Sequence, residues 1–134
     1  MTRVTLTTTF NDITGFADLT ILNLLINNAI DGRNACYVAF IRAAGTLVLV
    51  NDAGDAGGPF AGSMTIPGSG SVMNSQCIVR AAGSSASGVG GTFTLTLDFE
   101  FAGSFRGDRI VYAAARDGQG NNSGWQSMGT VTVP

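Results

Sequence analysis

Three oxygen-bearing side chains follow an apolar run within the segment LVLVNDAGDAGG, which spans residues 47–58. Asn51, Asp52 and Asp55 are of the types that ligate a hard cation such as calcium. Calcium is held by about 6–8 oxygens around one point, however, and this spacing does not match an EF-hand loop. Asn and Asp side chains also accept hydrogen bonds from their own backbone in turns. We therefore expect a turn after a strand and no cofactor, with a calcium site at these three residues as the alternative.

Two carboxylates close together in the sequence raise the question of catalysis. Asp98 and Glu100 lie in the segment TFTLTLDFEF, residues 92–101, and a glycosidase needs two carboxyl groups roughly 5–10 Å apart in a cleft. Strict alternation with apolar residues instead predicts that both face solvent from a half-buried strand. The chain contains no histidine, which removes the commonest general base. We predict that the protein is not an enzyme and has no catalytic residues.

Aromatic and amide side chains suggest a different chemistry, the binding of sugars. Exposed aromatic rings can stack on a sugar while amides bond to its hydroxyl groups, and the candidate rings are Trp125, Tyr37, Tyr112 and Phe60. Asn121 and Asn122 lie close to Trp125 in the sequence. The alternative is that Trp125 fills the core or covers an edge of the fold. The exposure of Trp125 and Tyr37 distinguishes the two interpretations.

Cys36 and Cys77 lie in segments that are both predicted to be strands. Neither has a second cysteine or a histidine near enough to build a zinc site. They are therefore either two buried free thiols or one disulfide that joins two strands. We favour the disulfide, which implies an oxidising compartment and hence an extracellular or cell-surface location.

Composition and charge exclude several classes of protein. Charged residues make up 12% of the chain and the net charge is −2, so no basic cluster marks a nucleic-acid surface. The densest apolar run, 19–26, is much shorter than the roughly 20 residues of a membrane span. No signal peptide is visible in this sequence. We expect either a cytoplasmic protein or a segment of a longer secreted chain, and the cysteines favour the second.

Eight or nine short strands are predicted from period-2 alternation and from runs of β-branched and aromatic residues. Those outside the ambiguous segment 16–30 are 3–10, 36–41, 46–50, 62–66, 71–81, 92–101, 109–115 and 126–133. Turn residues separate several of them, at 42–45, 67–70, 83–91 and 117–122.

The segment 16–30 is ambiguous between a helix and a strand. Apolar residues recur in it at helical spacing, between Thr14 as a helix N-cap and Gly32 as a C-cap. Further apolar residues, Ile21, Leu24 and Leu25, would interrupt the polar face of such a helix. We favour a strand. The whole pattern predicts one domain over residues 1–134, an all-β antiparallel sandwich, with a closed barrel as the alternative.

The chain also resembles a known group of proteins. The segments DGRNACYVAF (31–40) and NNSGW (121–125) are the most specific part of a similarity that covers nearly the whole sequence. It is similar to an Ig-like β-sandwich module of large secreted or surface proteins from Acidobacteria. The resemblance implies an Ig-like fold, a paired Cys36 and Cys77, and neighbouring domains in a parent protein, but no established activity.

Two functions follow as expectations from these observations. The first is a non-catalytic structural or adhesive module of a secreted or cell-surface protein, with a glycan or a protein surface as its ligand. The second is a carbohydrate-binding module that uses Trp125, Tyr37, Asn121 and Asn122.

Overall fold

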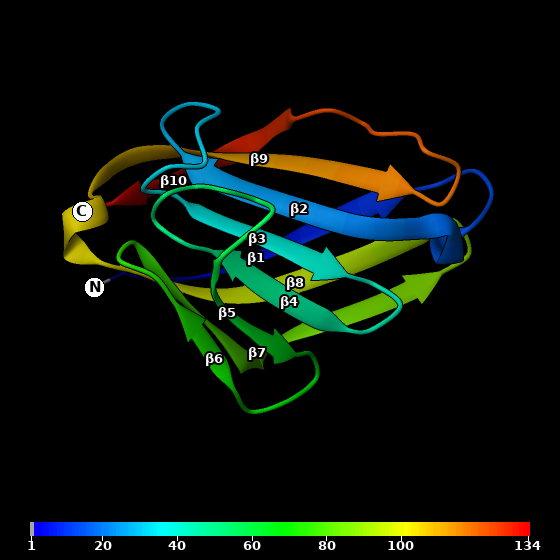
Figure 1. Cartoon of the computed structure of the whole chain (residues 1–134), viewed down its shortest axis with the longest axis horizontal. Coiled ribbons are helices and arrows are strands. Elements are labelled where there is room, and N and C mark those ends of the chain that lie inside the picture. The colour runs from blue at the N-terminus through cyan, green and yellow to red at the C-terminus, as the bar shows by residue number, and fades with distance from the viewer. Residues whose placement is uncertain (1) are drawn as a thin grey trace.

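The computed structural model describes residues 2–134 and confirms an antiparallel β-sandwich of two sheets (Figure 1). The first sheet has four strands, in the order β1 (Thr2–Asn11), β8 (Thr92–Phe101), β7 (Cys77–Val89) and β6 (Ser71–Met73). The second has six, in the order β10 (Gln126–Val133), β9 (Gly107–Asp117), β2 (Leu19–Asn27), β3 (Cys36–Ile41), β4 (Thr46–Val50) and β5 (Phe60–Thr65). Short 3₁₀ turns, η1 (Phe16–Asp18) and η2 (Gly103–Phe105), precede β2 and β9. The described chain thus has ten strands, one or two more than the sequence predicts.

Alternate residues of both sheets meet in one hydrophobic core, as period-2 alternation requires. Phenylalanines dominate its centre: Phe99 stacks on Phe101, and Phe101 stacks on Phe105 of η2. The predicted inward face of β8 is confirmed, because its phenylalanines and leucines are all buried.

Strand β2 settles the ambiguity of residues 16–30 in favour of a strand, preceded by the 3₁₀ turn η1. Leu24 points into the core between the sheets, so Leu25 must point to the opposite, outer face of the sheet. Leu25 is nevertheless only 2% exposed, and Val50 on the same face is only 1% exposed. Around Leu25 and Val50 the six-stranded sheet is therefore apolar and covered on its outer face as well as its inner one, which is why β2 lacks the alternation of a half-buried strand.

Two loops provide this outer cover. Trp125, in the loop between β9 and β10, packs edge-on against Tyr37 of β3, with ring centroids 5.6 Å apart. Ala56, in the loop between β4 and β5, lines the same hollow as Val50. That loop lies in front of β3 in Figure 1.

The turn predicted at 83–91 is wrong, because β7 continues through this Gly- and Ser-rich stretch as far as Val89. Two glycines of this stretch are required because neighbouring side chains pack directly against their backbone. A Cβ on Gly88 would lie 2.3 Å from the ring of Phe16, and a Cβ on Gly83 would lie 2.5 Å from the carboxylate of Asp98. The strand predicted at 71–81 is also divided in two by a turn between β6 and β7.

The predicted disulfide is present between Cys36 of β3 and Cys77 of β7, so it joins the two sheets. Both cysteines are buried in the core. Asn74, in the turn just before Cys77, donates from Nδ2 to the carbonyls of Ala35 (2.9 Å) and Val50 (3.2 Å). Covalent and hydrogen-bonded links therefore hold the same junction between the sheets.

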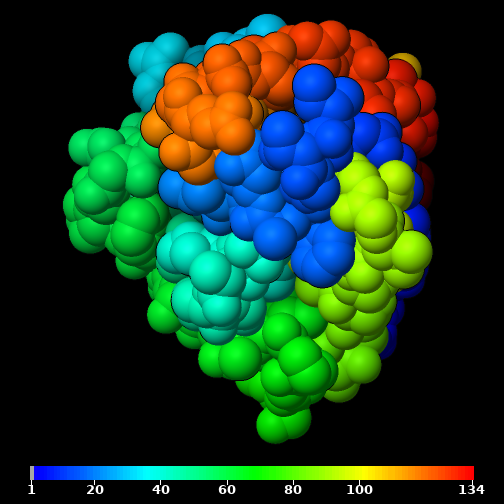
Figure 2. Space-filling view, turned by 90° about the vertical axis from the view of Figure 1, so that its right-hand side faces the viewer, coloured from blue at the N-terminus to red at the C-terminus, as the bar shows by residue number. Residues whose placement is uncertain are grey.

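Both chain termini lie at one end of the sandwich, together with η2 and the β2–β3 loop (Figure 1). The β1–η1 turn and the β3–β4, β7–β8 and β9–β10 loops gather at the opposite end, which faces the viewer in Figure 2. Among residues 2–134 there is no helix with the length and apolar character that a membrane crossing requires.

Removing the disulfide should lower stability substantially. Replacing Cys36 and Cys77 together by alanine releases a loop of about 40 residues in the unfolded chain, so we expect the free energy of unfolding to fall by roughly 3–4 kcal/mol. Urea denaturation measures the free energy of unfolding of the variant, of the oxidised protein and of the reduced protein. The reduced protein should behave like the variant, and a loss below about 1 kcal/mol in both would contradict the prediction.

Candidate functional site

A groove runs across the outer face of the six-stranded sheet, and we refer to it as the outer-face groove. It consists of two adjoining hollows of about 150 and 440 Å³, and Arg116 at the end of β9 lines both. The first lies over β2 and β3 and includes Asn23 and Tyr37. The second includes Asn121 and Asn122. A separate hollow of about 220 Å³, which the same two amides also line, lies at the end of the sandwich, beside Leu19 and Ala115 on the core side of the sheet. In profile, the green β4–β5 loop and the orange β9–β10 loop project on the same side of the molecule (Figure 2).

The two candidate aromatic residues lie together, and each is half-buried. Tyr37 lines the first hollow, while Trp125 meets its ring edge-on. Gly32 also lies against Tyr37, since a Cβ on Gly32 would approach the tyrosine ring to 3.2 Å. Trp125 thus combines both roles considered from the sequence, since it covers part of the outer face while remaining partly exposed.

The two candidate amides, Asn121 and Asn122, are exposed at the other end of the groove. Each uses one side-chain atom to shape the loop: Asn121 donates from Nδ2 to Asp117 (2.9 Å), and Asn122 accepts at Oδ1 from the Gly124 backbone (2.9 Å). The remaining atom of each amide, Oδ1 of Asn121 and Nδ2 of Asn122, has no hydrogen-bond partner among residues 2–134. One acceptor and one donor are therefore available in this part of the groove.

Arg116 supplies a positive charge to the groove. Its guanidinium has no hydrogen-bond or ion-pair partner within residues 2–134, and the residue is exposed. Burial raises the pKa of Tyr37, while the charge of Arg116 acts in the opposite direction. The two side chains are thus close enough to interact electrostatically across the first hollow.

A second hollow, which we call the end pocket, lies beside the β2–β3 loop at the end that carries the termini. It has a volume of about 310 Å³ and is lined mainly by polar side chains, among them Asn28, Arg33, Gln76 and Arg109. Arg109 covers the ring of Phe105, with its guanidinium carbon 3.9 Å from the ring centroid. Sequence reasoning did not identify this pocket, because its residues come from three separate parts of the chain, 27–34, 76 and 104–109.

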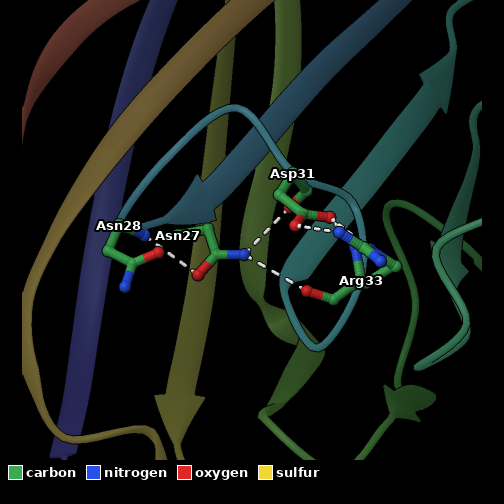
Figure 3. Close-up of polar contacts among 4 residues, drawn as sticks. All are labelled: Asn27, Asn28, Asp31 and Arg33. Carbon is green, nitrogen blue, oxygen red and sulfur yellow. Dashed lines mark hydrogen bonds and ion pairs between the residues drawn. The ribbon is translucent and has the colours of Figure 1, made fainter.

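Asn27 organises the wall of the end pocket (Figure 3). Its buried amide donates from Nδ2 to the carbonyls of Asp31 (2.9 Å) and Arg33 (3.2 Å). Its Oδ1 accepts from the Asn28 backbone (2.9 Å) and from Nη1 of Arg109 (3.1 Å). Next to it, the Arg33 guanidinium forms an ion pair with Asp31 and lowers the pKa of that carboxyl. These contacts use the side chains of Asn27 and Asp31 to hold the loop.

The residues considered for calcium, Asn51, Asp52 and Asp55, each have a separate local partner. Asn51 accepts from the Ala53 amide (3.1 Å) and Asp55 accepts from the Gly57 amide (2.8 Å), which are the predicted turns. Asp52 instead accepts from the backbone and hydroxyl of Ser75. Their oxygens therefore fix the β4–β5 loop and tie it to the turn before β7.

The sequence did not single out a different acidic group, Asp12, Asp18 and Asp117. One carboxylate oxygen from each lies within 4.8 Å of the others, at the end of the molecule shown in Figure 2. Thr14 donates hydrogen bonds to Asp12 and lowers the pKa of its carboxyl, and Asn121 has the same effect on Asp117. The three residues meet only through folding, because β9 brings Asp117 beside the start of β2.

The carboxylates considered for catalysis are both in ion pairs. Asp98 accepts from Nε (3.1 Å) and Nη2 (2.7 Å) of Arg3, and Glu100 pairs with Arg80. The expectation that Asp98 faces solvent is wrong, since it is 4% exposed. The packing of Gly83 against Asp98, and the ion pair with Arg3 on the adjacent β1, account for this burial.

Replacing Asn27 by alanine should destabilise the fold by roughly 2–3 kcal/mol, because buried carbonyls and Arg109 lose their partner. The matched control is Asn28→Ala, which removes an exposed amide without a side-chain hydrogen bond within residues 2–134 and should change stability by less than about 0.5 kcal/mol. Urea denaturation compares them. Equal stabilities for the two variants would contradict the assigned role of Asn27.

The Arg3–Asp98 pair should make stability depend on pH. Hydrogen bonds from Arg3 hold the pKa of Asp98 below its ordinary value of about 3.9. The pair therefore stabilises the fold above that value, and its contribution is lost as the pH falls through the lowered pKa. The difference in melting temperature between the protein and Asp98→Asn should be present at pH 7 and shrink below about pH 4. In an Arg3→Met background this pH dependence should be absent, and a constant difference from pH 7 to pH 2 would contradict the prediction.

Comparison with known proteins identifies no relative. The chain matches no protein-family model, no curated protein and no solved structure. Its function has therefore to be inferred from the groove, the end pocket and the fold that supports them.

Proposed function

We propose that this chain is a non-catalytic adhesive module of a secreted or cell-surface protein, an Ig-like sandwich of the kind that its sequence resembles. The buried disulfide between the sheets supports an oxidising compartment. The ion pairs of Asp98 and Glu100 support a non-catalytic role, because they give both carboxylates a structural use. Neighbouring domains of a parent protein are part of this proposal.

The observation that carries the proposal is the outer-face groove. It lies over the central strands of the sheet, which are fixed by a full backbone ladder from β10 to β5. A rigid floor lowers the entropy cost of binding, because few groups have to be ordered when the ligand arrives. Side chains that do not hold the fold, Arg116 above all, face the groove.

The chemistry of the groove favours a carbohydrate as the ligand, which is the second candidate function. One end presents the half-buried ring of Tyr37, and the other presents the unpaired Oδ1 of Asn121 and Nδ2 of Asn122. Hydroxyl groups both donate and accept hydrogen bonds, so a row of them suits this mixture of acceptors and donors. An elongated groove also suits a chain of sugar units better than a single small molecule.

Replacing Arg116 by alanine tests this function. Affinity electrophoresis through soluble polysaccharides, followed by calorimetry with oligosaccharides of those retained, should reveal binding by the unaltered protein. Arg116→Ala should weaken the binding about tenfold, because a charge-assisted hydrogen bond contributes roughly 1.5–3 kcal/mol.

The matched control is Arg106→Ala, an exposed arginine beside η2 at the opposite end of the molecule. It should leave the affinity unchanged while altering the net charge equally. Failure to bind any polysaccharide would remove the carbohydrate candidate. Equal losses in the two variants would show that the groove is not the binding surface.

A further inference from the structure

Asn23 occupies an unusual position on the floor of the outer-face groove. It lies on β2 with Ala39 of β3 opposite it on one side and Ala114 of β9 on the other. Its amide has no hydrogen-bond partner among residues 2–134, although the side chain is half-buried. Asparagine is disfavoured in strands, and the Asn23 amide, which solvent still reaches, holds no other part of the fold. The Asn23 side chain thus makes no hydrogen bond that stabilises the fold, and this points to a role in binding a ligand.

The short side chain of Ala39 leaves space beside Asn23. Side chains of cross-strand neighbours on one face normally touch, so a larger residue at position 39 would fill the hollow. With alanine at this position, a hollow of about 150 Å³ is left over the sheet. Its walls are apolar where they are formed by Ile21 and Val50. A single amide thus lies at the base of an otherwise mostly apolar cup.

An amide at the base of an apolar cup is complementary to a second amide that carries a small apolar group. The Asn23 side chain offers one donor and one acceptor side by side, which can pair with the carbonyl and N–H of a ligand amide. The apolar walls favour a methyl group. An acetamido group has these three features together. A hydroxyl group alone would satisfy Asn23 but leave the walls without a partner.

The rest of such a ligand would extend toward the larger hollow. Arg116 lines both hollows, so a group bound over Asn23 continues past Arg116 toward Asn121 and Asn122. A sugar ring that carries the acetamido group would place its hydroxyls among these polar side chains. Resting on the proposed carbohydrate-binding function, we propose that the hollow over Asn23 binds the acetamido group of an N-acetylated amino sugar.

Calorimetry with matched oligosaccharides tests the inference. The probes are oligomers of N-acetylglucosamine, the same oligomers without acetyl groups, and glucose oligomers of equal length. The protein should bind the acetylated oligomer at least tenfold more tightly than either of the others, because only it places an amide and a methyl group in the hollow. Asn23→Leu should abolish this preference. It should not lower the melting temperature, since Leu25 on the same face of the same strand is already tolerated.

Ala39→Val provides a second variant, which fills the hollow while leaving Asn23 in place and should also abolish the preference. Ser63→Ala, an exposed position on β5 outside the groove, is the control and should change nothing. Binding of all three oligomers with equal affinity would overturn the acetamido inference and leave the carbohydrate function standing. Binding of none of the three would overturn the acetamido inference, and the absence of binding to any polysaccharide in the electrophoresis would overturn the carbohydrate function as well. A preference for the acetylated oligomer that survives in Asn23→Leu would overturn the assignment of the hollow.

Discussion

A sheet with apolar side chains on both faces has to be covered on both faces, and much of this structure follows from that requirement. The core between the sheets covers one face of β2, β3 and β4, and the β4–β5 and β9–β10 loops cover part of the other. Where the loops stop, the sheet remains open as the outer-face groove. The candidate binding surface is therefore the part of the outer sheet face that the two loops leave open. Its floor is rigid because it is a hydrogen-bonded sheet, and its rim consists of the loops that cover the rest of the face.

The strands were largely predictable, because their boundaries follow from local alternation and turn residues. Residues 36–41, 46–50, 92–101 and 126–133 were predicted with the bounds that the structure has. The stretch 83–91 was not, since its glycines and serines are set by distant partners. Gly88 is small because Phe16 packs on it, and no local pattern contains that information. Asp98 was misjudged for the same reason, because Arg3 lies on another strand.

The candidate site could be predicted only by residue type. Tyr37, Trp125, Asn121 and Asn122 were identified as the kinds of side chain that bind sugars, and the structure places them along or beside one groove. Asn23 was not identified, because an asparagine within an apolar strand has no local signature of function. Its significance depends on the short side chain of Ala39, which register brings beside it from β3. Arg116 was not identified either, because it lines the groove only through the pairing of β9 with β2, which the sequence does not reveal.

The disulfide has a mechanical consequence for a protein whose proposed role is adhesion. Tension applied through the two termini passes from residue 36 to residue 77 through the sulfur atoms, not through the chain between them. Strands β3, β4, β5 and β6 all lie within that bypassed segment. With a sequence separation of 41, the disulfide shortens the fully stretched chain by roughly 140 Å, at about 3.4 Å per residue. Because β3 forms part of the groove floor, pulling can separate it from β2 but cannot draw it out into an extended chain.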